Sequence, residues 1–285
     1  MMNIIRADIY RLHKGNGLII TFAVLIFVIA MLSLTGGQVG GGISYETIDT
    51  MDEAMGTVAN GDLADLGQVA MDELEAAFLA PTGVESAYKA TASSNNILYF
   101  LLPLISLVTI VDFSSGAVKN ALSSGVSRTK YFFAKLTLSF IFCAVFLLVY
   151  ALLSVLLSTL VSGFGGTFDG VFISWFVKIL LSQLWLCLAT VCAANFFAFL
   201  MRSPGFVGVF IAFLLVPSLL VYGLTFINRW FENLFYFDLT MTIGLMARID
   251  LLTAGEITKI LVVGAVYIVA SVIGGLVVFR KAEIK

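Results

Sequence analysis

Six long apolar runs constrain this chain more than any other feature of its sequence. A helix that crosses a bilayer needs roughly 20 mostly apolar residues. The chain is 60% hydrophobic and 12% charged, whereas a soluble domain carries about 25% charged residues. We therefore predict an all-α polytopic membrane protein, with residues 1–285 forming a single transmembrane domain. The six predicted spans are residues 17–35, 95–111, 136–162, 172–201, 205–227 and 257–279.

An amphipathic helix is expected before the first span. Residues 3–14 place apolar side chains on one face at helical spacing, with basic side chains that can reach lipid headgroups. A cleaved signal peptide is the alternative for this charged start, but no A-x-A site follows and later runs span the membrane again. The residues expected to act at the membrane interface are Ile5, Arg6, Ile9, Arg11 and Leu12.

Residues 36–94 form the one long polar segment, in which acids outnumber bases ten to one. Apolar residues at helical spacing predict one or two amphipathic helices there, outside the membrane. The acids can attract a cationic substrate or metal ions. They can equally form the solvated face of a translocated loop, and their spacing does not match a calcium loop. Residues 228–256 are rich in aromatic side chains, and they predict short, partly re-entrant helices on the outer face of the membrane rather than a full span.

Residues 112–135, between the second and third spans, carry four bases against one acid. The bases are Lys119, Arg128, Lys130 and Lys135, and the acid is Asp112. A serine at 114 or 115 is expected to cap a short amphipathic helix whose apolar face includes residues 117, 118, 121 and 122. Gly125 permits a left-handed stop, and Ser127 is expected to cap the long helix that follows.

Charge predicts the topology. If both termini and the loops after the second and fourth spans lie inside, 11 of the 16 bases and only three of the 18 acids are cytoplasmic. Because cytoplasmic loops are enriched in Lys and Arg, we predict a multi-pass protein of the plasma membrane with both termini in the cytoplasm.

Sequence motifs for catalysis or cofactor binding are missing. The sequence contains no Gly-x-x-x-x-Gly-Lys-Ser/Thr phosphate loop and no His-Glu-x-x-His zinc motif. It also lacks a Gly-x-Ser-x-Gly nucleophile motif, and its three cysteines have no CxxC spacing. We expect no enzyme activity, cofactor or metal site in this chain, and its net charge of −2 gives no basic face for nucleic acid. The predicted spans also contain almost no ionisable groups of the kind that ion-coupled transporters use, so any uphill transport must draw energy from a partner.

The order of segments, together with the motifs Asp112-x-x-x-Gly116, Asn120-x-Leu122 and Gly125-Val126-Ser127-Arg128, resembles the membrane subunit of type-2 ABC exporters, the ABC-2 permease family. It is similar to the small six-span permeases of Gram-positive bacteria. The resemblance implies that residues 112–135 form a coupling helix that sits in a groove of a separate ATPase. Ala117 stands where the family often has Thr, and Gly125 where it often has Pro. The implied coupling residues are Asp112, Gly116, Lys119, Asn120, Gly125, Ser127 and Arg128.

The implied function is export of a hydrophobic or amphipathic cargo, such as an antimicrobial or toxin peptide, a drug or a lipid-like molecule. The partners would be an ABC ATPase that binds ATP and Mg, a second permease of the same or a related sequence, and membrane lipid. Ordinary anchoring by positive charge is the alternative role for Arg128. The alternative for the whole chain is a non-transporting immunity or sensor protein that binds a peptide through its acidic outer loop.

Overall fold

The computed structural model describes residues 2–35, 82–92, 97–246, 249 and 251–282. These residues form helices and connecting turns without any strand. The helices are α1 (Met2–Lys14), α2 (Asn16–Thr35), α5 (Gly83–Ala92), α6 (Ile97–Ile105), the π-helical η2 (Ser106–Ile110), α7 (Val111–Ser114), α8 (Ala117–Ser123), α9 (Arg128–Ser162), α10 (Gly170–Met201), α11 (Phe206–Thr225), the 3-10 helical η3 (Arg229–Phe237), α12 (Leu239–Leu245) and α13 (Ala254–Lys281).

Four described helices, α9, α10, α11 and α13, are long and apolar enough to cross a membrane. Two further candidates are helix pairs with a sharp bend. The α1–α2 pair bends by 70°, and the segment of residues 101–114 bends by 68° against α8. The prediction of an all-α protein is therefore confirmed, with four to six candidate spans among the described residues, while the count of six stays a prediction.

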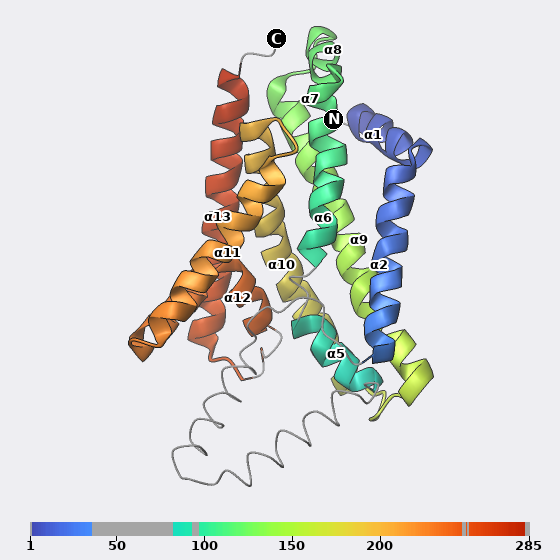
Figure 1. The fold of residues 1–285 in the computed structure, drawn as a ribbon, viewed down its shortest axis with the longest axis vertical. Coiled ribbons are helices and arrows are strands. Elements are labelled where there is room, and N and C mark those ends of the chain that lie inside the picture. Colours follow the sequence, from blue (N-terminus) through green and yellow to red (C-terminus); the bar gives the residue numbers. More distant parts are fainter. Residues whose placement is uncertain (1, 36–81, 93–96, 247–248, 250, 283–285) are drawn as a thin grey trace.

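The long helices run side by side, with α10 at the centre (Figure 1). In the most apolar part of α10, 61% of the residues are buried, against 33% in α9, 22% in α13 and 17% in α11. Figure 1 shows α1, α7, α8 and both chain ends at its top, which we call the α8 end, and α5 and α12 toward the bottom, which we call the α5 end. The segments predicted to be cytoplasmic thus lie at one end of the bundle.

Side-chain caps explain where several helices begin. The Ser127 hydroxyl accepts a hydrogen bond from the Lys130 N–H at the start of α9, as predicted. Asp169 caps α10 in the same way, and α13 begins with a reciprocal capping box between Thr253 and Glu256. Each cap satisfies backbone N–H groups that the first turn of a helix leaves without partners.

A π-helical turn follows the proline of the second predicted span. Pro103 lies inside α6, and residues 106–110 follow as the π-helical η2 before α7 begins. Proline removes one backbone N–H from the helical ladder, and a local π-helical turn is one way for a membrane helix to restore its hydrogen bonds. The second predicted span, residues 95–111, is thus a composite of α6 and η2, and it ends where α7 begins.

Small residues allow α13 to pack closely against α9 and α10. A Cβ atom added to Gly275 would lie 2.8 Å from the Phe132 ring of α9, and one added to Gly274 would lie 3.0 Å from the Phe196 ring of α10. Ser271 on the same helix is buried. Without side chains at these glycines, the neighbouring aromatic rings can lie against the backbone of α13.

At the α5 end, α5 packs along the end of α9. The Ser86 hydroxyl of α5 donates to the Ser158 hydroxyl of α9 at 2.5 Å, and the Gly83 N–H donates to the Gly163 carbonyl at 3.0 Å. The short helices expected within residues 228–256 are present as η3 and α12. The other helices predicted for the acidic loop fall on residues 36–81, outside the described residues.

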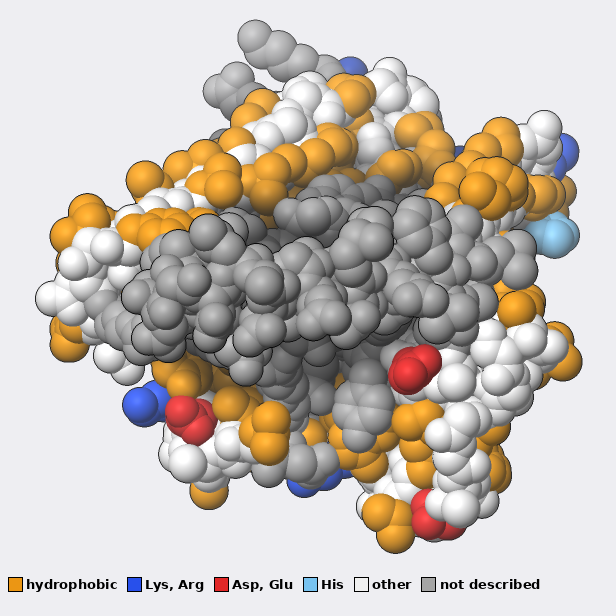
Figure 2. All heavy atoms as spheres, turned by 60° about the horizontal axis from the view of Figure 1, so that its bottom comes forward, with side chains coloured by type: hydrophobic (Ala, Val, Ile, Leu, Met, Phe, Trp, Pro, Cys, Tyr) orange, Lys and Arg blue, Asp and Glu red, His pale blue; other side chains and the backbone are white. Residues whose placement is uncertain are grey.

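The flanks of the bundle are apolar. Figure 2, which brings the α5 end forward, shows hydrophobic side chains along much of the described rim and few charged ones. A soluble monomer rarely exposes apolar patches beyond a few hundred Å², so these flanks fit contact with lipid tails. Strongly exposed apolar side chains include Ile19 and Phe27 of α2, Leu152 and Leu160 of α9, Leu219 and Leu220 of α11, and Val266 and Ile273 of α13.

Candidate functional site

The short helix α8 presents polar side chains at the tip of the bundle. Val118 is buried, while Lys119 and Asn120 on the next positions are exposed. Ala121 and Leu122 are half-buried and pack against the core. The predicted amphipathic character of α8 is therefore present. Its exposed side carries Lys119 and Asn120, two of the expected coupling residues, where they can contact another molecule.

Two glycines in left-handed conformation mark the ends of this segment, Gly116 with φ 72° and Gly125 with φ 88°. The predicted cap by Ser114 or Ser115 is wrong. The residue that begins α8 is Gly116, without a side-chain cap, and the Ser114 hydroxyl donates back to the Val111 carbonyl. A side chain is disfavoured at positive φ, so glycine at 116 allows the sharp turn from α7 into α8 and moves the start of α8 past both serines.

Below α8 lies a buried cluster of charges that joins three helices. It consists of Asp8 and Arg11 of α1, Asp112 of α7, and Tyr131 and Lys135 of α9; we call it the charge cluster. Lys135 Nζ lies 2.6 Å from Asp8 Oδ2 and 2.5 Å from Asp112 Oδ2. The Arg11 guanidinium donates to Asp112 Oδ1 and lies 3.2 Å from Asp8 Oδ1.

The charge cluster is mostly buried, with Arg11 as its one partly exposed member, and it is electrically balanced. The side chain of Lys135 is fully buried, while Asp8 and Asp112 are 6% and 3% exposed. The Tyr131 hydroxyl donates to Asp112 Oδ2, which leaves that carboxylate with three donors. Two carboxylates face two cations, so the net formal charge is zero. Such a cluster is costly to break, because removing one member leaves an uncompensated buried charge.

The two carboxylates, both outside the predicted spans, respond differently to this environment. Burial is the largest influence on each and favours the neutral acid. For Asp8 the effect of burial is larger than the opposing effect of the Lys135 cation, so the pKa of its carboxyl is raised above its ordinary value. For Asp112 the bonds from Lys135, Tyr131 and Arg11 together outweigh burial, and the pKa is lowered. Asp112 is therefore the firmly ionised centre around which the cations gather.

The predicted entry helix packs differently from the expectation. Ile5 and Leu12 are buried, but Ile9 is 46% exposed, and the position between them on the packed face is taken by Asp8. Arg6 is exposed, as a headgroup-facing residue should be. Arg11, also expected at the headgroups, instead binds Asp112 and the Leu107 carbonyl. Asp8 thus ties α1 to α9, and Arg11 ties it to α7.

Arg128 has a role within the protein that differs from the one expected of it. Its Nη1 atom lies 2.8 Å from the Phe279 carbonyl, 2.9 Å from that of Arg280 and 2.7 Å from that of Ala282. These carbonyls belong to the C-terminal end of α13, where a helix leaves acceptors without partners and the dipole favours a cation. Arg128 therefore fixes the start of α9 to the end of α13.

A second polar group lies deeper, where η2 meets α9 and α10. Asn195 Oδ1 is 3.4 Å from the Thr109 hydroxyl of η2 and 3.5 Å from the Ser139 hydroxyl of α9. The Asn195 amide donates to the Val191 carbonyl of its own helix. All three side chains are fully buried. These contacts indicate that Asn195 forms hydrogen bonds between helices.

Sequence reasoning missed Asp8, Tyr131 and Lys135 as members of the site. The signal for Asp8 was a single acid in an otherwise basic amphipathic helix, one turn before Arg11. Lys135 follows the Ser127 cap by two helical turns and so enters the bundle, and Tyr131 stands one turn before it on the same face. No group of three or more metal-ligating side chains occurs in the described part of the chain.

Comparisons with protein-family models, with curated proteins and with solved structures found no match to this chain. The family resemblance therefore depends on the segment order and the motifs of residues 112–135.

Proposed function

We propose that this chain is the membrane subunit of an ATP-driven exporter and that the polar face of α8 docks on a separate ATPase. The single observation that carries the proposal is the charge cluster, which joins the base of the α7–α8 segment to α1 and α9. An exposed docking helix is useful for coupling only when its displacement reaches the membrane helices. Through Asp112 and Lys135, a force on α8 would act on both the second and the third predicted spans.

In this proposal the α8 end faces the cytoplasm, in keeping with the excess of bases there. Closure of two ATPase subunits on ATP would shift a pair of permease chains between inward-open and outward-open states. The ATPases must bind these states unequally for this to happen. The exposed Lys119 and Asn120 are the proposed contacts with the ATPase, whereas Gly116, Gly125, Ser127 and Arg128 shape the segment and hold it to the bundle.

The proposal is tested by co-purification. The tagged chain is expressed in its native cells, extracted in mild detergent, and compared with the variant Lys119→Glu/Asn120→Arg. We expect an ATPase to accompany the wild type and to be largely lost from the variant, because both side chains point away from the protein. The matched control is Lys281→Glu, an exposed base at the same end of the bundle. Equal recovery of the ATPase with all three proteins would refute the docking site.

A further inference from the structure

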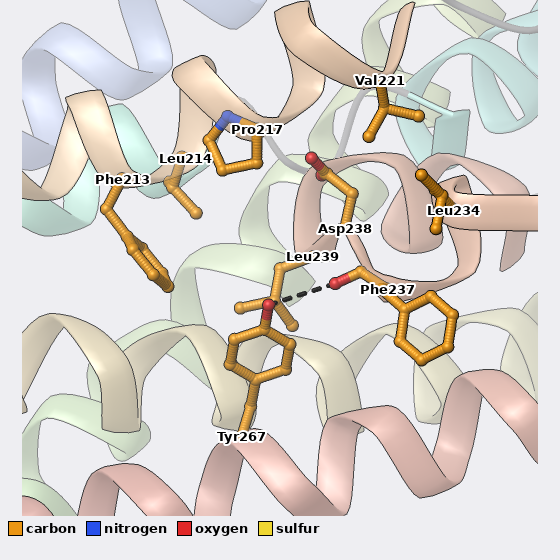
Figure 3. Close-up of a pocket in the computed structure, with 9 residues that line it drawn as sticks. All are labelled: Phe213, Leu214, Pro217, Val221, Leu234, Phe237, Asp238, Leu239 and Tyr267. Carbon is orange, nitrogen blue, oxygen red and sulfur yellow. Dashed lines mark hydrogen bonds between the residues drawn. The ribbon is translucent and has the colours of Figure 1, made fainter. Parts of the chain in front are cut away.

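A cavity of about 230 Å³ lies on the far side of the bundle from the charge cluster, between α11, η3, α12 and α13. Figure 3 looks into it, with Phe213 and Phe237 on either side, Asp238 above and Tyr267 below in this view. Its lining is apolar except for two groups, the Asp238 carboxylate and the Tyr267 hydroxyl. The remaining lining residues are Leu214, Pro217, Val221, Leu234 and Leu239.

Asp238 is an acid buried at the wall of this cavity, with 6% of its surface exposed. Its Oδ1 accepts from the Thr240 N–H at 2.8 Å, the Thr240 hydroxyl at 2.6 Å and the Met241 N–H at 3.1 Å. Among the described residues, its Oδ2 accepts from the Ser218 hydroxyl alone, at 2.6 Å. A carboxylate offers about four acceptor positions, so Oδ2 retains capacity for one more donor.

Within the described part of the chain, the Asp238 carboxylate has hydrogen-bond donors but no cationic partner. None of the ion pairs among the described residues includes it. A buried carboxylate without a counter-charge is costly, and its four present donors are all neutral. A ligand that brings a positive charge to the free position on Oδ2 would therefore gain more than a neutral one.

The rest of the cavity wall suits the same kind of ligand. Phe213, Phe237 and Tyr267 contribute aromatic rings, whose faces attract cations. The volume lies below the roughly 300–1,000 Å³ of sites that enclose a whole drug-sized molecule. It has room for one cationic group with a short alkyl or aromatic group attached. Phe237 is 60% exposed, so the cavity is open to the surroundings of the helices, where the remainder of a longer molecule can lie.

We propose that this cavity binds the cationic end of an amphipathic molecule, with an ammonium or guanidinium group at Asp238 Oδ2 and an adjoining apolar group between Phe213 and Leu239. The proposal deepens the proposed function, on which it rests, by naming an amphipathic cation as the class of cargo. An amine-bearing lipid headgroup offers the same chemistry, and the experiment below separates the two sources.

The test measures binding of radiolabelled 4-phenylbutylammonium, and of the neutral 4-phenylbutanol, to the purified chain in phosphatidylglycerol nanodiscs, after subtracting binding to empty discs. The variant is Asp238→Asn, which removes the charge and preserves the helix cap, because Asn caps helices as well as Asp. Its amide can donate to Ser218, whose own hydroxyl already lies 2.9 Å from the Leu214 carbonyl and can donate there. The matched control is Asp169→Asn, an exposed cap at the start of α10.

We expect Asp238→Asn to bind the amine at least tenfold more weakly than the wild type does, with binding of the alcohol unchanged and Asp169→Asn behaving as wild type. Equal binding of the amine by wild type and Asp238→Asn would overturn the proposal. If Asp238→Asn fails to fold, the two affinities of the wild-type protein still test the proposal. Equal affinity of the wild type for the amine and the alcohol would overturn the role of the charge.

Replacing the lipid by phosphatidylethanolamine identifies the source of the cation. Competition by this lipid would assign the cavity to an amine headgroup, and unchanged binding would assign it to a free amphipathic cation; either result supports the ligand class. The assay needs no ATPase, so its failure is separate from that of the exporter proposal. A chain that recruits an ATPase without preferring the amine refutes only the cavity, and the reverse result refutes only the exporter.

Discussion

Replacing Lys135 by Met should destabilise the protein strongly, because it removes the fully buried cation of a neutral charge cluster. Methionine retains the length of the side chain but leaves Asp8 and Asp112 facing Arg11 alone, with a net charge of −1. Losing one partner of a buried ion pair costs about 3–5 kcal/mol. Arg11 is half-buried and still compensates one carboxylate, so we expect the lower end, about 3 kcal/mol.

The assay is thermal unfolding in detergent, followed by intrinsic tryptophan fluorescence. With roughly 2–4 °C per kcal/mol for chains of about this size, a loss of about 3 kcal/mol lowers the midpoint by roughly 6–12 °C. The double variant Lys135→Met/Asp8→Asn restores a neutral cluster and should recover about 1–2 kcal/mol. The control Lys119→Met alters an exposed lysine and should shift the midpoint little. Additive losses in the double variant would refute the reasoning.

Two further substitutions test how α13 is held. Arg128→Gln removes the charged donors at the end of α13 and should cost about 1–3 kcal/mol, with faster proteolysis of the C-terminal residues; an unchanged midpoint and cleavage rate would count against this contact. Gly275→Ala places a methyl group 2.8 Å from the buried Phe132 ring and should cost about 1–3 kcal/mol. Its control is Gly208→Ala, because an added Cβ at Gly208 would meet no atom of another part of the protein within 4 Å. This control should be neutral or stabilise the protein by up to about 1 kcal/mol. Equal effects of the two alanines would contradict the packing argument.

Much of the fold could be predicted because apolar runs and helix caps are local features. The last residues of the predicted spans lie within a few residues of the ends of the long helices. Ser127 caps the start of α9 and Gly125 follows the end of α8, as their chemistry predicts. The start of α8 was misplaced for a local reason as well. Ser114 and Gly116 compete to end one helix and begin the next, and the left-handed turn that glycine permits decided the outcome.

The charge cluster could not be predicted, because its members are far apart in the sequence. Lys135 and Asp8 are separated by 127 residues, and Arg11 and Asp112 by 101. Amphipathic periodicity places Asp8 on the face of Ile5 and Leu12, but no local pattern names its partner on another helix. Basic residues near a membrane surface are expected to face headgroups, and this expectation concealed the roles of Arg11 and Lys135.

The same limit applies to Arg128 and to the cavity at Asp238. The motif around Arg128 suggested a contact outside the protein, whereas three carbonyls of α13 bind its guanidinium in the folded chain. Asp238 looked like one acid among several in an aromatic, interfacial segment. Only the folding of η3 and α12 against α11 brings it beside Ser218 and into an apolar wall.

The most direct test of the exporter proposal is the native mass of the complex extracted from its own cells, measured by mass spectrometry in mild detergent. We predict two permease chains, identical or related, together with two ATPase subunits, and a mass that falls to the permease chains alone in the Lys119→Glu/Asn120→Arg variant. A wild-type chain that is found alone, or only with copies of itself and no ATPase, would contradict the exporter proposal and favour an immunity or sensor protein.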